Sequence, residues 1–242
     1  MMDEKEVASV LSKALIAKGG DGRIEACLFD MDGVLLDSMP SHSVSWVQAV
    51  ETVQIKETPN YFYQCEGQVG RETIINLFQQ HKNRFPTKDE IEKVYALKCS
   101  LFDDYDKHLA VDYAVEMISD LVDKKLPIFL VTGSGHPSLK NRLQTHFGNI
   151  WSDQNIISAS DVKFGKPHPE PYLRALERVQ KEANRCLVIE NAPLGVKSAT
   201  AADLAVLAVN TGPLPDEELL RAGAISVQSN LRQIHAIIKC LL

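Results

Sequence analysis

A short apolar segment that ends on two aspartates constrains this chain more than any other feature. Residues 24–29 (IEACLF) are apolar apart from Glu25, a pattern that predicts a buried strand. Asp30 and Asp32 follow directly, so they would lie just past the carboxyl end of that strand, where open parallel sheets place their ligand sites. Gly33 then allows the backbone to turn sharply. We therefore expect a ligand site at the end of this strand.

The two aspartates together point to a particular chemistry. Two carboxylates this close cannot both be ionised at low cost in a dry site unless a cation is present. If a metal holds one of them, the other can carry a proton, and their roles separate. That division suits phosphoryl transfer, with a carboxylate nucleophile, a carboxyl acid/base and Mg²⁺ on the phosphate oxygens. An aspartate-rich surface turn is the alternative for this segment taken alone.

The rest of the chain alternates helix and strand patterns, as a doubly wound parallel sheet requires. Further strands are predicted at 126–131, 155–158, 186–189, 205–209 and 224–227, and helices at 112–124, 137–147, 170–181, 194–202, 216–222 and 231–241. Residues 39–107 interrupt this alternation with helical patterns only, including a capping-box sequence from Thr87 to Glu90. The predicted fold class is α/β, a Rossmann-like doubly wound parallel-sheet core with an inserted all-helical cap domain.

The predicted domains are a helical extension at 1–22, the α/β core at 23–38 and 108–242, and the helical cap at 39–107, entered through a linker at 37–40. Apolar residues recur at helical spacing in the extension, which ends at Gly19-Gly20. This extension is expected to be a peripheral packing helix or an oligomer contact, with a disordered tail as the alternative.

Charge and cysteine usage limit the class of protein. The net charge of -6, with no basic block, argues against a nucleic-acid partner. The five cysteines are scattered without a Cys-x-x-Cys pair, which is typical of reduced thiols. No apolar run reaches the length of a membrane span, and the acidic start is unlike a signal peptide. We therefore expect a cytoplasmic protein that binds neither membranes nor nucleic acid, and the oligomeric state stays open.

Three further motifs follow later strands. Thr132, Gly133 and Ser134 combine hydroxyl groups with a glycine-rich turn that can bind phosphate oxygens, although such residues also form ordinary turns. Lys166 lies in a rigid Gly-Lys-Pro segment, unlike an ordinary surface lysine whose side chain is free to move. Lys163 is the alternative candidate for the functional lysine of this motif. Glu190 and Asn191 end another strand, and an amide oxygen such as that of Asn191 can coordinate Mg²⁺ without adding charge.

The string FDMDGVLLDS at 29–38, with these three motifs in order, resembles the haloacid dehalogenase superfamily of phosphotransferases, in particular its β-phosphoglucomutase-like branch. The resemblance runs from Ile24 over nearly the whole chain. It implies a Mg²⁺ cofactor and an aspartyl-phosphate on Asp30, with Asp32 as the acid/base. It also implies that Thr132, supported by its two neighbours, binds phosphate and that Lys166 balances the charge of the transferring phosphate.

The implied metal ligands are Asp30, the backbone carbonyl of Asp32, Glu190 and Asn191. Members of the family usually carry two acids in the fourth motif, so Asn191 leaves the site one negative charge short. Weaker Mg²⁺ binding or recruitment of another carboxylate is expected. Glu66, in a glycine-bearing loop of the cap, is the candidate carboxylate, and an ordinary loop acid is the alternative.

Other cap residues are assigned by the same resemblance. His42 matches a cap histidine that positions the acid/base aspartate in the mutases. Arg71 is a candidate for holding a distal phosphate, because a guanidinium forks onto phosphate, and Gln68 is the alternative at that place. The pair Glu190-Asn191 together with Glu66 resembles branch members that hydrolyse inorganic pyrophosphate.

The expected function is a phosphohydrolase acting on a small phosphorylated compound, with pyrophosphate as the first candidate. One alternative is a β-phosphoglucomutase that interconverts β-glucose 1-phosphate and glucose 6-phosphate. An alternative of another class is a phosphate-binding protein that has lost turnover together with its second acidic ligand.

Overall fold

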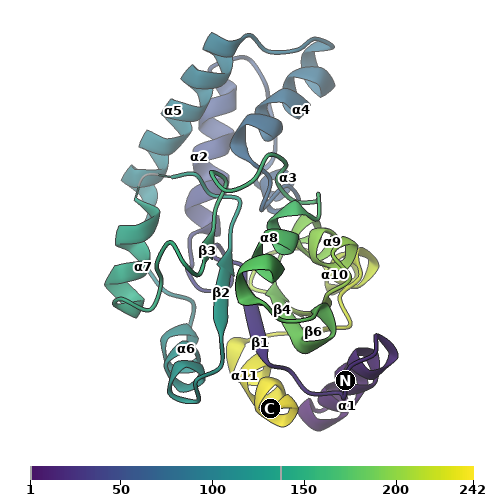
Figure 1. Cartoon of the computed structure of the whole chain (residues 1–242). Helices are drawn as coiled ribbons and strands as arrows, with labels where there is room; N and C mark the ends of the chain where they lie inside the picture. The colour runs from purple at the N-terminus through teal and green to yellow at the C-terminus, as the bar shows by residue number, and fades with distance from the viewer. Residues whose placement is uncertain (1, 137) are drawn as a thin grey trace.

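The computed structural model describes residues 2–136 and 138–242. Six parallel strands form one sheet in the order β3-β2-β1-β4-β5-β6 (Figure 1). The strands are β1 (Ala26–Phe29), β2 (Ile128–Val131), β3 (Ile156–Ile157), β4 (Cys186–Glu190), β5 (Ala205–Val209) and β6 (Ser226–Gln228). In such an order the direction of winding reverses between β1 and β4, and ligands bind in the crevice at that point. The predicted fold class is confirmed.

Helices cover both faces of the sheet. The elements outside the insertion are α1 (Glu4–Ala17), α6 (Ala114–Asp123), α7 (Leu139–Phe147), α8 (Glu170–Val179), the 3₁₀ turn Ala183–Arg185, α9 (Pro193–Ala201), α10 (Asp216–Ala222) and α11 (Leu231–Leu241). Alternate residues of each strand enter different apolar clusters. Cys27 and Phe29 pack with the buried residues of α1, α6, α7 and α11, whereas Ala26 and Leu28 pack with those of α8, α9 and α10. The sheet is therefore buried on both sides, as parallel sheets are.

Several predicted boundaries differ by one or two residues from the observed ones. The strand expected from residue 24 begins at Ala26, because the N–H groups of Ile24 and Glu25 donate to Leu241 O and Arg185 O, outside the sheet. The last strand is shifted from 224–227 to Ser226–Gln228. The helix expected from Pro137 starts on a residue outside the described part of the chain, and α7 begins at Leu139.

Helix α1 is packed against the core. Asp3 and Glu6 form a capping box at its start, and Leu11 and Leu15 are fully buried. The helix lies against α11, near the C-terminus (Figure 1). A disordered tail is therefore excluded for residues 4–17. In the described part of the chain, no helix combines the length and apolarity that crossing a bilayer requires.

Between β1 and α6 the chain forms four consecutive helices, α2 (Met39–Glu51), α3 (Pro59–Gln64), α4 (Gly70–Lys82) and α5 (Lys88–Tyr105). They gather at one end of the molecule around their own apolar cluster, which includes Trp46, Phe62 and Phe78 (Figure 1). The linker predicted at 37–40 is too long, because α2 begins at Met39 and Pro40 occupies its first turn, where its missing N–H costs nothing.

Two antiparallel segments join this helical insertion to the core. The N–H of Asp37 donates to Leu109 O at 2.9 Å, and the N–H of Val111 donates to Leu35 O at 3.0 Å. The outgoing and returning chains are thus paired at one place, which leaves the insertion connected to the core by a narrow neck. The domain boundaries at residues 38/39 and 107/108 stay a prediction.

Candidate active site

The centre of the site is a buried lysine between two carboxylates. Lys166 is 1% exposed, and its Nζ lies 2.5 Å from Asp30 Oδ1, 2.6 Å from Glu190 Oε1 and 2.9 Å from Val131 O. Tyr172 Oη donates to the same Glu190 oxygen at 2.8 Å. β1 and β4 are neighbours, so the ends of these strands bring Asp30 and Glu190 together, as the sequence predicted.

Three buried oxygen atoms beside this lysine have no hydrogen-bond partner among residues 2–136 and 138–242: Asp30 Oδ2, Glu66 Oε1 and Asn191 Oδ1. They come from the residue after β1, the helical insertion and the residue after β4, and Asn191 Nδ2 donates to the other Glu66 oxygen at 2.9 Å. Oxygens of carboxylates and amides are the ligands that Mg²⁺ prefers. This donor set therefore fits the cation that the sequence predicted.

The charges of the cluster also favour a bound cation. Three buried carboxylates, those of Asp30, Glu66 and Glu190, face the single ammonium of Lys166. Burial raises the pKa of Asp30 to about 8, with Lys166 opposing the shift and Glu190 adding to it. Burial and the carboxylate of Asp30 raise the pKa of Glu66 well above its ordinary value. Without a cation this cluster would take up protons, and a divalent ion would keep the carboxylates ionised.

Glu190 differs from the other predicted ligands. Its Oε1 accepts hydrogen bonds from Lys166 and Tyr172, and its Oε2 accepts from the backbone N–H groups of Asn191 and Ala192 at 3.0 and 3.3 Å. All of its accepting capacity in this structure is directed at protein donors. Glu190 thus orients Lys166. Because both of its carboxylate oxygens already accept hydrogen bonds from the protein, the structure does not support Glu190 as a direct metal ligand.

Asp32 lies in a separate network that includes the helical insertion. Ser38 Oγ donates to Asp32 Oδ1, and His42 Nε2 lies 3.2 Å from the same oxygen. The ammonium of Lys98 is 2.7 Å from His42 Nδ1. Burial would raise the pKa of Asp32, but His42, Arg142 and Ser38 together hold it below its ordinary value. Asp32 is therefore ionised here, the state that can accept a proton.

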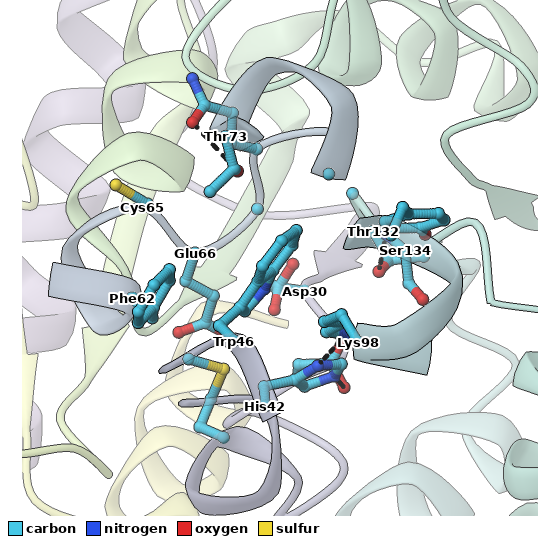
Figure 2. A pocket seen from close by; sticks show the side chains of 17 residues that line it. Asp30, His42, Trp46, Phe62, Cys65, Glu66, Thr73, Lys98, Thr132 and Ser134 are labelled. Carbon is cyan, nitrogen blue, oxygen red and sulfur yellow. Dashed lines mark hydrogen bonds and ion pairs between the residues drawn. The ribbon is translucent and has the colours of Figure 1, made fainter. Parts of the chain in front are cut away.

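The loop after β2 completes the site. Thr132 is buried, and its Oγ1 accepts a hydrogen bond from the N–H of Ser134 at 3.0 Å. Both residues line a cavity of about 70 Å³ with Asp30 and Asp32 on the core side and residues of the insertion opposite. Figure 2 shows Asp30 in the middle of the site, with Glu66 and His42 of the insertion around it and Thr132 and Ser134 on the opposite side from Glu66. The site is thus formed between the two parts of the chain.

Glycine allows the insertion to approach this loop closely. A Cβ atom added to Gly133 would lie 2.2 Å from Gly67 O, and one added to Gly67 would lie 2.6 Å from Lys166 Cδ. Gly67 also has a φ of +82°, which favours glycine. The insertion and the core therefore meet backbone to backbone in this closed arrangement.

We expect Gly133→Ala to lower kcat/KM about 100-fold, the order of loss that a displacement of 1 Å at an active site can cause. The added methyl group would overlap Gly67 O and keep the insertion from closing. Gly135→Ala is the matched control in the same loop, because its Cβ would meet its nearest neighbour, Ala159 Cβ, at an ordinary 3.5 Å. Phosphate release by both variants, with thermal unfolding as a folding check, measures the effect. Equal activities would contradict it.

One predicted cap residue lies outside the site. Arg71 is exposed in the first turn of α4 and does not line the cavity, so a role in holding a distal phosphate stays a prediction that this geometry does not support. Gln68 lines the cavity, and its Oε1 accepts a hydrogen bond from Thr73 at 3.2 Å. The reason is local, since α4 begins at Gly70 and Gln68 precedes it in the loop that faces the core.

Lys98 and Arg142 were missed by the sequence analysis. Lys98 lies between Val94 and Phe102 at four-residue spacing on the buried face of α5, and Arg142 adjoins Leu143 on the buried face of α7. A charged residue within an apolar helical stripe is costly to bury unless it is paired. That interruption was the available signal, although it does not identify the partner.

Known proteins are similar to this chain in sequence over most of its length. The model of the haloacid dehalogenase-like hydrolase family matches residues 24–203. A Haemophilus influenzae protein described only as uncharacterized is 33% identical over 188 residues, covering 77% of this chain and 92% of its own length. A phosphorylated carbohydrates phosphatase of Thermotoga maritima is 27% identical, covering 84% of this chain and 94% of its own.

Solved structures agree with these matches. A protein of Bacteroides vulgatus, described as a "putative beta-phosphoglucomutase", superposes with a TM-score of 0.91 at 35% identity and covers 97% of this chain and 98% of its own. The similarity therefore includes the helical insertion as well as the sheet.

Proposed function

Because the chain belongs to the haloacid dehalogenase-like hydrolases, we propose that it is a Mg²⁺-dependent phosphohydrolase with inorganic pyrophosphate as its first candidate substrate. The observation that carries the proposal is the trio of unpartnered oxygens on Asp30, Glu66 and Asn191. Two of these residues belong to the family's catalytic motifs, and the third comes from the insertion.

The chemistry proceeds through an aspartyl-phosphate. Asp32, which is ionised in the absence of substrate, first takes up a proton from the solvent or from the incoming phosphate. An Asp30 oxygen then attacks phosphorus, the bond from phosphorus to the leaving oxygen breaks, and Asp32 passes this proton to the leaving oxygen. A water molecule then attacks the phosphoryl group and gives a proton to Asp32, and cleavage of the Asp30–phosphorus bond releases orthophosphate. Thr132 and Lys166 hold the phosphoryl oxygens during both steps.

Asp30, Glu66 and Asn191 would hold the metal, together with the backbone carbonyl of Asp32. When bound, Mg²⁺ supplies positive charge to the phosphate oxygens. Glu190 keeps Lys166 in place from the other side. Closure of the insertion excludes bulk water.

The size of the cavity supports a small substrate. The cavity between the insertion and the core is small, with a volume of about 70 Å³. Glu66 is buried in the wall that a bulkier substrate would have to displace. Both features favour a compact anion such as pyrophosphate over a sugar phosphate.

A β-phosphoglucomutase is the second candidate. The contact between His42 and Asp32 is the arrangement that the mutase resemblance implies, and the Bacteroides vulgatus neighbour carries the mutase description. Relatives at 26–27% identity are described as phosphatases of hexitols and of phosphorylated carbohydrates, so sugar phosphates belong in the test.

The deciding experiment measures phosphate release, with Mg²⁺, from pyrophosphate and a panel of sugar phosphates. Conversion of β-glucose 1-phosphate to glucose 6-phosphate is followed in parallel. Rapid pyrophosphate hydrolysis without isomerisation supports the proposal. Efficient isomerisation would replace it with the mutase, and stoichiometric phosphate binding without turnover would indicate a binding protein.

Replacing Glu66 with Gln is expected to raise the half-saturating Mg²⁺ concentration about tenfold, the lower end of the loss seen when metal-site partners are removed. The amide keeps the shape of the side chain and removes one negative charge from the cation's surroundings. Titrating Mg²⁺ while following pyrophosphate hydrolysis measures the shift. The control is Glu92→Gln, the same substitution at an exposed residue of the cap. An unchanged titration would exclude Glu66 from the metal site.

A further inference from the structure

Arg142 is a buried arginine that the proposed chemistry leaves without a role. It lies on α7 of the core and is 5% exposed. Its Nε is 3.0 Å from Asp106 Oδ2, and its Nη2 is 3.7 Å from Asp32 Oδ1. The guanidinium also lies over the ring of Phe102, 4.7 Å from the ring centroid. A buried guanidinium is costly unless its partners are well placed, so the arrangement requires an explanation.

The partners of Arg142 belong to the helical insertion and its neck. Phe102 is in the last turn of α5, and Asp106 caps the end of that helix, where the chain returns to the core. Asp106 is buried as well. A residue of the core therefore contacts the returning chain and Asp32 with one rigid planar group.

The same aromatic ring supports a second neighbour of Asp32. The imidazole of His42 stacks on Phe102 with centroids 4.1 Å apart and an interplanar angle of 19°. His42 and Arg142 both reach Asp32 Oδ1, one from the insertion and one from the core. His42 and Arg142, which both pack on the ring of Phe102, thus approach this carboxylate oxygen from two directions.

We propose that Arg142 is a positioning residue that holds Asp32 in place to transfer protons when the insertion is closed. Asp106 and Phe102 orient the guanidinium, and its Nη2 edge restrains the Asp32 carboxylate. This inference rests on the proposed acid/base role of Asp32. Arg142 itself contacts neither the phosphoryl group nor the leaving oxygen.

Two phosphate donors with different proton requirements test the proposal. When Asp30 attacks pyrophosphate, the departing phosphate oxygen takes a proton from Asp32. When it attacks acetyl phosphate, the P–O bond breaks to release acetate, which leaves without a proton. Both donors form the same aspartyl-phosphate, whose hydrolysis then requires Asp32 to accept a proton from water.

For Arg142→Met we expect kcat/KM with pyrophosphate to fall roughly 100-fold, the lower end of what general acid–base catalysis contributes. With acetyl phosphate, kcat/KM should change less than about threefold, because formation of the aspartyl-phosphate does not need a proton from Asp32. The kcat should fall and the aspartyl-phosphate trapped by acid quenching should accumulate, because its hydrolysis does need Asp32. Arg142→Lys should recover part of the loss, since an ammonium keeps the charge but lacks the fork. A role in folding alone would lower both kcat/KM values together.

Three controls separate the outcomes. Arg178→Met removes an arginine that pairs with Asp161 outside the site, and it should behave like the wild type. Asp32→Asn reports on the proposed function, which fails if this variant loses kcat/KM equally with both donors. If Asp32→Asn keeps its kcat/KM with acetyl phosphate and Arg142→Met loses it, the proposed role of Arg142 is overturned while that of Asp32 stands. If Arg142→Met does not fold in a thermal unfolding assay, Arg142→Lys carries the same comparison.

Discussion

Asp30→Asn is expected to abolish turnover, with a loss of roughly 10,000-fold or more, because removing a nucleophile eliminates the covalent route. The amide has nearly the shape of the carboxyl group but no anionic oxygen to attack phosphorus. Lys166 keeps its contacts with Glu190 and with Val131 O. The substitution also removes one carboxylate from a cluster with excess negative charge.

The folded protein should therefore tolerate this change. We expect its free energy of unfolding to stay within about 1 kcal/mol of the wild type, because no buried charge loses its partner. Phosphate release and denaturant unfolding measure the two effects, and acid quenching tests for the loss of the aspartyl-phosphate. Asp112→Asn, at a side chain that is 85% exposed, is the matched control. Retained activity, or a phosphorylated residue other than Asp30, would refute the assignment of the nucleophile.

Lys166→Met should damage both activity and stability. We expect kcat/KM to fall about 1,000-fold, since the lysine stabilises the charge that develops on the transferring phosphoryl group. Asp30 and Glu190 would also lose the ammonium that lies 2.5–2.6 Å from each of them. Removing one partner of a buried ion pair costs about 3–5 kcal/mol, because the remaining charges stay buried and unpaired.

Phosphate release measures the loss of kcat/KM, and urea unfolding measures the loss of unfolding free energy. EDTA is present during unfolding so that no bound metal offsets the missing ammonium. Lys163→Met is the matched control, because Lys163 is an exposed lysine three residues earlier in the same loop. Lys163 is also the alternative to Lys166 that the sequence leaves open. If the Lys163 variant lost activity and the Lys166 variant did not, the assignment of the phosphate-binding lysine would be reversed.

Local patterns were sufficient for the sheet and for half of the site. Strands β1 to β5 are short, mostly apolar runs that are recognisable without knowledge of their neighbours, whereas β6 (Ser226–Gln228) has polar residues at both ends. Once the strands are parallel, their carboxyl ends meet at one edge, which places Asp30, Thr132 and Glu190 together. The helical insertion was equally visible, since residues 39–107 lack any strand pattern.

The roles taken by the insertion needed the folded chain. Glu66 has the sequence surroundings of an ordinary loop acid, and its burial against Asn191 joins residues that are 125 positions apart. Arg71 matched a phosphate-binding role by residue type, yet it is exposed on α4. Nothing in a helical pattern specifies which face of an inserted domain will close over the core.

The chain's local sequence thus accounts for its strands, its helices and the residues at the strand ends, because backbone periodicity and turn chemistry act over a few residues. The contacts of Lys98 with His42 and of Arg142 with Asp32 and Asp106 arise from the packing of α5 and α7 around the neck. Their physical cause is the need to pair buried charges from distant segments, which exists only after those segments have been brought together.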